Sequence, residues 1–184
     1  MKKATYLLIA ILALSIFFDG CKKKNETPNN QMTYDGVEYT LSHGLVFIFG
    51  ENEGDGVYSY DLILLSPGFI LHDNDSISGI GHGIVFELYS SNSSNPGSGD
   101  YIYDGSGEDH VGTCGYSDAV FNYNIETGEG TDVEAIGGKV NVTVNGDEYE
   151  VSIDLTMAGG KSLTGFYKGT LKLIPYETKS TRKF

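Results

Sequence analysis

The chain has 184 residues, with 25 acidic and 12 basic side chains, and it is 40% hydrophobic and 20% charged. This length suits a single domain with one hydrophobic core, and the hydrophobic content excludes a wholly disordered chain. The net charge of −13 argues against nucleic acid as a partner, because phosphate binding requires a basic face.

The first twenty residues predict a secretion signal and not a part of the fold. Lys2 and Lys3 precede an apolar run of thirteen residues from Tyr6 to Phe18, interrupted only by the small polar Ser15. A helix of that length rises about 20 Å and is too short to span about 30 Å of hydrocarbon. A basic start followed by a short apolar stretch is typical of a secretory signal peptide, so we interpret residues 1–20 as a removed signal.

The end of this signal resembles the lipobox of bacterial lipoproteins. Phe18-Asp19-Gly20-Cys21 places a small residue directly before a cysteine, as that motif does, although Phe18 stands where Leu is usual. The resemblance implies that Cys21 becomes the new N-terminus and is diacylated through its sulfur, which would anchor the protein in a membrane. The alternative is ordinary cleavage that leaves Cys21 as a free thiol.

Charge divides the remaining chain into three parts. Residues 21–31 hold Lys22, Lys23 and Lys24 followed by polar side chains, and we interpret them as the lipidated cysteine and a flexible tether. Residues 32–176 are expected to form a single β domain, and residues 177–184 a basic tail. From Asn25 onward there are seven basic and 24 acidic residues, a difference of −17, which strengthens the exclusion of nucleic acid.

The C-terminal third predicts three antiparallel strands in sequence. Val140, Val142 and Val144 alternate with polar residues before a turn at Asn145-Gly146. The alternation resumes from Tyr149 to Leu155, turns again at Ala158-Gly159-Gly160, and continues from Leu163 to Leu173. Strict alternation between short glycine-bearing turns is typical of an antiparallel meander.

Further strands are predicted upstream, with a hairpin at 34–41 around Asp35-Gly36. The other predicted segments are 45–49, 57–65, 84–89, 101–103 and 119–125, and residues 90–100 read as a polar loop. Eight to ten short strands without helices predict an all-β fold. We expect an antiparallel β-sandwich, with a closed calycin-like β-barrel as the alternative.

Several of these segments resemble small secreted lipoproteins of Bacteroidetes. The similar segments are residues 34–41, 137–142, 149–151 and 165–171, with the patterns Y-x-G-x-x-Y-x-L, G-x-V-x-V and G-x-Y-x-G-x-L. The resemblance implies an all-β lipoprotein of the outer membrane and brings no catalytic residues with it.

The sequence offers no clear catalytic or metal-binding motif. None of His43, His72, His82 and His110 has the spacing of a zinc site, and no Gly-x-Ser-x-Gly elbow occurs. Cys114 is the second of two cysteines and is expected to be a packed residue, with His110 as a weak candidate partner. The glycine-rich segment 79–83 precedes a predicted strand and not a helix, so we interpret it as a turn and not as a phosphate-binding loop. We predict no cofactor.

Two acidic loops and two tyrosine pairs are the remaining candidates. Glu51–Asp55 and Asp73–Ser76 carry the oxygen ligands that Ca²⁺ prefers, but neither has the spacing of an EF-hand. The tyrosines occur in pairs two residues apart, which places each pair on one face of a strand as a possible sugar platform or as core packing: Tyr58 with Tyr60, and Tyr101 with Tyr103.

These observations predict a non-catalytic, lipid-anchored outer-membrane protein with a binding, adhesion or accessory role. The alternatives are a barrel that carries a small apolar ligand or lipid, and a hydrolase with unidentified carboxylates. The membrane is the expected partner through Cys21. An envelope protein or glycan partner, the oligomeric state, and the choice between the periplasmic and the cell-surface face remain open.

Overall fold

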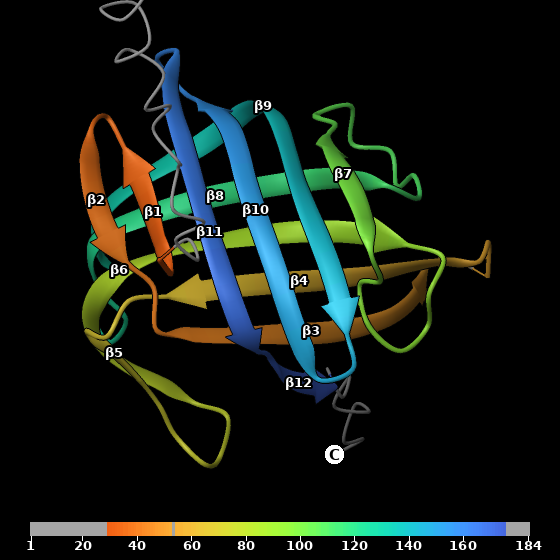
Figure 1. Ribbon diagram of the computed structural model, residues 1–184, viewed down its shortest axis with the longest axis horizontal. Coiled ribbons are helices and arrows are strands. Elements are labelled where there is room, and N and C mark those ends of the chain that lie inside the picture. Colours follow the sequence, from red (N-terminus) through yellow and green to blue (C-terminus); the bar gives the residue numbers. More distant parts are fainter. Residues whose placement is uncertain (1–28, 53, 176–184) are drawn as a thin grey trace, which may run out of the picture.

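The computed structural model describes residues 29–52 and 54–175, which form strands joined by turns and loops (Figure 1). The strands in chain order are β1 (Gln31–Tyr34), β2 (Val37–Thr40), β3 (His43–Asn52), β4 (Val57–Leu65), β5 (Phe69–Leu71), β6 (Ile77–Ser90), β7 (Gly99–Tyr103), β8 (Thr113–Asn124), β9 (Glu129–Asn145), β10 (Glu148–Met157), β11 (Lys161–Thr170) and β12 (Lys172–Pro175). No helix among these residues is long and apolar enough to cross a membrane.

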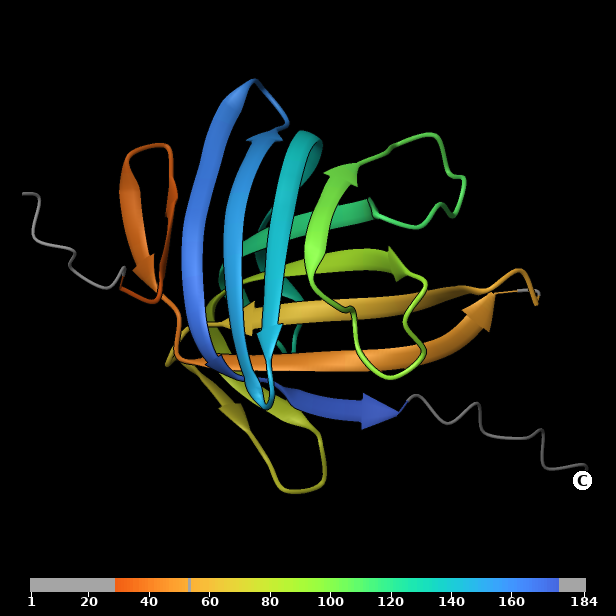
Figure 2. The same cartoon turned by 45° about the vertical axis from the view of Figure 1, so that its right-hand side comes forward.

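The strands form one continuous sheet that curls into a half-barrel. Its order is β12-β3-β4-β6-β8-β7-β9-β10-β11-β1-β2, with β5 paired to β6 and an additional pairing of β8 with β9. Neighbours are antiparallel except for β12 with β3 and β7 with β8. In both views β9, β10 and β11 cross steeply over β3, β4 and β6, so the sheet provides two facing walls (Figures 1 and 2).

One stretch of chain fastens this curl to itself. β11 pairs with β10 along its whole length and with β1 over four residues. After the single residue Leu171, β12 lies parallel to β3, at the other end of the strand order. Because β11 pairs within one wall and β12, directly after it, pairs with β3 of the other wall, this stretch of chain holds the two walls together.

Side chains from the two walls fill the space between them. Those that are fully or almost fully buried include Met32, Tyr60, Leu62, Leu64, Ile84, Phe86, Leu88, Leu155, Met157 and Leu163, which belong to one cluster. A second, smaller cluster contains Leu45, Leu65, Phe69 and Ile174. The interior is therefore a packed core, which burial of this apolar surface stabilises.

The structure confirms the all-β fold and the C-terminal meander. β9, β10 and β11 pair in the predicted order, and the expected strand at 57–65 is β4 with the same bounds. The turn between β9 and β10 consists of Gly146 and Asp147, one residue later than predicted. The two layers expected of a sandwich are the walls of one curled sheet, and the calycin-like barrel stays open as the alternative description.

Two local predictions are wrong. Residues 79–83 are not a turn but part of the first half of β6, where the ladder with β8 shifts register between Gly81 and Gly83. The alternation predicted to continue through Leu173 stops at Leu171, and Leu173 is 41% exposed while Ile174 is buried. The alternation changes phase because the chain pairs with β10 up to Thr170 and with β3 from Lys172 onward.

The close pairing of β9 with β10 predicts that any side chain at Gly138 lowers the stability of the fold. Its φ is +107°, and a Cβ there would lie 2.3 Å from the carbonyl oxygen of Asp154. We expect Gly138→Ala to lower the free energy of unfolding by at least about 2 kcal/mol, because the strained backbone and the clash add. Urea unfolding measures this change.

Gly137 is the matched control, since a Cβ there meets nothing within 4 Å. We expect Gly137→Ala to change the free energy of unfolding by less than about 1 kcal/mol. Equal effects of the two substitutions would contradict the backbone argument.

Candidate functional site

The proposed lipid attachment residue, Cys21, lies outside the described residues. Glu53, in the first acidic loop, does too. The tether was expected to extend to Gln31, but Gln31 is the first residue of β1 and pairs with Phe166 of β11. The folded domain therefore begins earlier in the chain than predicted.

The four histidines lie apart and have different surroundings. His72 hydrogen-bonds Ser78 Oγ through Nε2 (2.7 Å), and His110 Nδ1 lies 3.7 Å from Asp104 Oδ2 at the exposed surface. His43 borders a hollow of about 270 Å³. No group of three or more His, Cys, Asp or Glu within residues 29–52 and 54–175 is placed to hold a metal ion.

Cys114 is packed in the core. Its side chain is fully buried, and Sγ lies 3.1 Å from the carbonyl oxygen of Tyr116. Burial raises the pKa of this thiol to about 12. Because the thiolate is the nucleophile and His110 is exposed, Cys114 has neither the ionisation nor the partner that nucleophilic catalysis needs.

Three carboxylates of the acidic loops make contacts within the protein. Glu51 Oε1 accepts the backbone N–H of Gly56 (2.9 Å), and Asp55 Oδ1 accepts that of Val57 (2.9 Å). In the second loop, Asp75 Oδ1 lies 2.6 Å from Lys172 Nζ. The acidic side chains of these loops therefore stabilise backbone turns, and one of them forms an ion pair with a lysine.

The tyrosine pairs face the interior and do not form a surface platform. Tyr60 is fully buried and Tyr101 is 3% exposed. Their hydroxyl groups donate to the carbonyl oxygens of Asn92 (2.5 Å) and Pro96, respectively, and thereby hold the polar loop between β6 and β7. Burial, with the neighbouring tyrosines, raises the pKa of Tyr60 to about 12.

The feature with binding character is a groove at the unpaired edge of β2. It has a volume of about 350 Å³ and is lined by residues 38–40 of β2, 66–68 after β4, 80–82 of β6, and Asn122 of β8. We name this set of residues the edge groove. It lies where the half-barrel does not close, because β2 ends the strand order and no other described strand pairs with its free edge.

Aromatic rings form one side of the edge groove. The rings of Tyr39 and His82 have centroids 4.6 Å apart, and Tyr39 also lies 4.9 Å from Phe121 in the core. The Nδ1 atom of His82 accepts the backbone N–H of Asn122 (3.2 Å), which places the ring proton on Nε2. Burial lowers the pKa of His82, so the neutral ring is favoured at neutral pH.

Close backbone packing forms the base of the edge groove. A Cβ at Gly68 would lie 2.2 Å from the carbonyl oxygen of Ile80, and one at Gly81 would lie 2.7 Å from Ser66 Oγ. Ser66 is buried and accepts the backbone N–H of His82 through Oγ (2.9 Å). The glycine-rich segment thus brings two backbones together.

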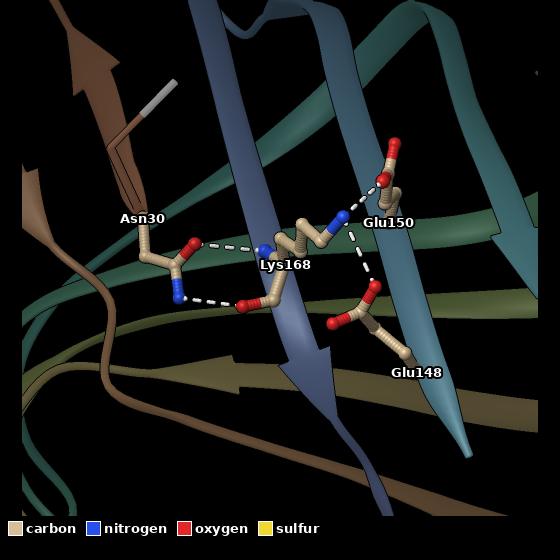
Figure 3. A network of polar contacts seen from close by, with 4 residues as sticks. All are labelled: Asn30, Glu148, Glu150 and Lys168. Carbon is tan, nitrogen blue, oxygen red and sulfur yellow. Dashed lines mark hydrogen bonds and ion pairs between the residues drawn. The ribbon is translucent and has the colours of Figure 1, made fainter. Parts of the chain in front are cut away.

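The β1–β2 hairpin, which lines the edge groove through β2, is fixed at its base and at its tip. At its base, Asn30 donates through Nδ2 to the carbonyl oxygen of Lys168 (2.9 Å) and accepts its N–H through Oδ1 (2.8 Å) (Figure 3). Lys168 Nζ lies 3.0 Å from Glu148 and 2.7 Å from Glu150 on β10. At its tip, Lys161 Nζ lies 2.6 Å from Asp35 Oδ2.

Two parts of this groove have a signature in the sequence, but their assembly has none. Residues 34–41 predict a hairpin and residues 79–83 a glycine-rich turn, and nothing in either pattern indicates that they face each other. The sequence signal that could have indicated the site is Tyr39, an aromatic residue in a short hairpin that lies outside the C-terminal meander.

The outer face of the sheet carries a repulsive carboxyl pair whose effect on stability is testable. Asp61 pairs with Glu87 across β4 and β6, and burial together with Glu87 raises the pKa of Asp61 to about 6. A carboxyl with a raised pKa favours folding at low pH, and this contribution is lost as pH rises through about 6. At pH 7 the ionised Asp61 therefore opposes folding.

We expect Asp61→Asn to raise the free energy of unfolding at about pH 7 by about 1 to 2 kcal/mol, after allowance for solvent screening, and to have little effect at about pH 4. Urea unfolding at both pH values measures this difference. Asp154→Asn, at an exposed position on β10, is the control. An equal gain from Asp61→Asn at both pH values would contradict the electrostatic explanation.

The buried position of Cys114 predicts an inert thiol. In a chain carrying Cys21→Ala, Cys114 is the only cysteine, and we expect a thiol reagent to label it only at the rate of unfolding. Ser152→Cys, at an exposed position, adds a thiol that should react at once. Immediate labelling of Cys114 in the folded protein would show that it is accessible.

Comparison of the chain with protein-family models, with curated proteins and with solved structures finds no match.

Proposed function

We propose that this chain is a non-catalytic binding protein of the cell envelope. It is held at the outer membrane by a lipid on Cys21, and its binding site is the edge groove. The observation that carries this proposal is a groove of about 350 Å³ with aromatic and polar sides on a domain whose interior is filled. Concave sites with a few convergent polar groups are where proteins bind ligands.

The filled interior argues against the alternative of an apolar-ligand carrier. Such a carrier needs an internal cavity, and here the space between the walls holds Tyr60, Phe86 and Met32, all fully buried. An apolar hollow of about 210 Å³ lies near Phe69 and Ile77, and it is smaller than the roughly 300 Å³ typical of small-molecule sites.

The positions of the titratable groups argue against the alternative of a hydrolase. Asp61 and Glu87 form the clearest carboxyl pair, but neither lines the edge groove. Within the edge groove, His82 Nδ1 is occupied by a backbone N–H and Glu38 is the lining carboxylate. Acid–base hydrolysis of a glycoside requires two carboxyl groups flanking the substrate.

The proposal makes separate predictions for the anchor and for the edge groove. Cys21→Ala removes the acylated sulfur, so we expect the protein to move from the membrane fraction to the soluble fraction in cell fractionation. Retention of this variant with membranes would contradict the anchor.

For the edge groove, Glu38→Lys reverses an exposed charge at its rim. We expect this variant to recover at least about tenfold less envelope material than the native protein in quantitative co-precipitation. Asp147→Lys makes the same two-unit charge change in the exposed turn between β9 and β10, which does not line the edge groove, and should recover native amounts. Equal recovery by all three proteins would place the binding site elsewhere.

A further inference from the structure

We propose that the edge groove binds an extended, basic peptide segment, which adds to β2 as a further strand. This inference rests on the proposed function, because it names the class of ligand for the same groove. It follows from the direction of backbone groups on β2, from the shape of the opening beside it, and from the charge around it.

Within residues 29–52 and 54–175, β2 has no strand partner on the side of the groove. Tyr34 pairs with Val37 across the two-residue turn, and the bond from Leu41 N–H to the carbonyl oxygen of Asn30 (2.9 Å) continues the same register. In an antiparallel ladder the bonding direction alternates along each strand. The N–H and C=O groups of Glu38 and Thr40 therefore point away from β1.

The opening beside β2 begins where strand pairing stops. Ser42 N–H donates to the carbonyl oxygen of Leu65 (2.8 Å), which joins the chain after β2 to the end of β4. From there towards Glu38, the edge of β2 separates from residues 66–68, and the edge groove occupies the gap. β2 has four residues and is about 13 Å long, which matches a short segment of an added strand.

The charges of the domain select a basic segment. All four lysines within residues 29–52 and 54–175 lie within 3.1 Å of a carboxylate, at Asp100, Asp35, Glu148 and Glu150, and Asp75. No ion pair to Glu38 is found among the same residues. A second copy of this chain would bring a body with 24 acidic and seven basic residues, so like charges oppose edge-to-edge dimerisation.

The two sides of an added strand would meet different surroundings. Side chains alternate across a strand, so every second residue of the peptide would lie on the side of Tyr39 and the others on the side of Glu38. The first side also has Ile80, which is 56% exposed and lines the groove. The fitting sequence therefore alternates apolar residues with Lys or Arg, a mode of recognition in which main-chain bonds supply affinity.

The test uses the mature chain carrying Cys21→Ala and a synthetic peptide of about eight residues that alternates Lys with Val. We expect saturable binding, and amide exchange at Glu38 and Thr40 that slows at least about tenfold in the complex. A peptide of the same sequence with alternate backbone nitrogens methylated should bind at least about tenfold more weakly, because it cannot donate to β2.

Two variants test the same bonds from the protein side. Thr40→Pro removes the N–H that points into the groove, at an edge position where proline is tolerated, and it should weaken binding at least about tenfold. Thr40→Val keeps that N–H and should bind as the native chain does. If Thr40→Pro fails to fold by circular dichroism, Glu38→Lys tests the charge, and it should favour a Glu-Val peptide over the Lys-Val peptide.

Several results would overturn the inference. Equal binding of the methylated peptide would exclude strand addition, and equal binding of the Glu-Val peptide would exclude selection of basic segments. Dimers that form through β2 would assign this edge to a second copy of the chain. Faster amide exchange at Glu38 and Thr40 after deletion of residues 177–184 would assign it to that segment. Absence of peptide binding, with loss of envelope material still caused by Glu38→Lys, would overturn this inference and leave the proposed function in place.

Discussion

A sheet with one apolar face must cover that face, and here the sheet covers it with itself. Residues 29–52 and 54–175 provide strands and no helix, so the apolar residues of β10 and β11 meet those of β4 and β6 across the curl. The break at Leu171 makes this possible, because it lets one stretch of chain pair with β10 and then with β3. A sheet that bends this strongly needs irregular strand pairing and close backbone contacts, and both occur as register shifts and at glycines.

The curl closes better on one side than on the other. β12 follows β11 after one residue and pairs with β3, which joins that end of the strand order to β11. At the other end, the chain after β2 meets the end of β4 through the bond from Ser42 to Leu65. Beyond that bond the walls diverge and the edge groove opens. The candidate site thus arises from the fold's incomplete closure, and the Asn30 and Lys168 contacts hold the β1–β2 hairpin in place beside it.

Local patterns in the sequence predicted local structure well. The alternation from Val140 to Leu155 and the turn residues Asp35-Gly36 require only neighbours in the chain, and both are found as expected. The sequence left alternatives open where the outcome depends on distant partners. Tyr60 and Tyr101 could line a sugar platform or pack in the core, and in the fold their hydroxyl groups reach carbonyl oxygens of a loop, so both rings are buried.

By itself the sequence determined the all-β character, the C-terminal meander and the acidic charge, because period-two alternation, glycine turns and composition are properties of the chain alone. Only the tertiary structure decided that the strands form one curled sheet, that segment 79–83 is a strand interior, and that Tyr39 faces His82. These features depend on which strands pair across long separations, and strand pairing leaves little trace in either partner's sequence.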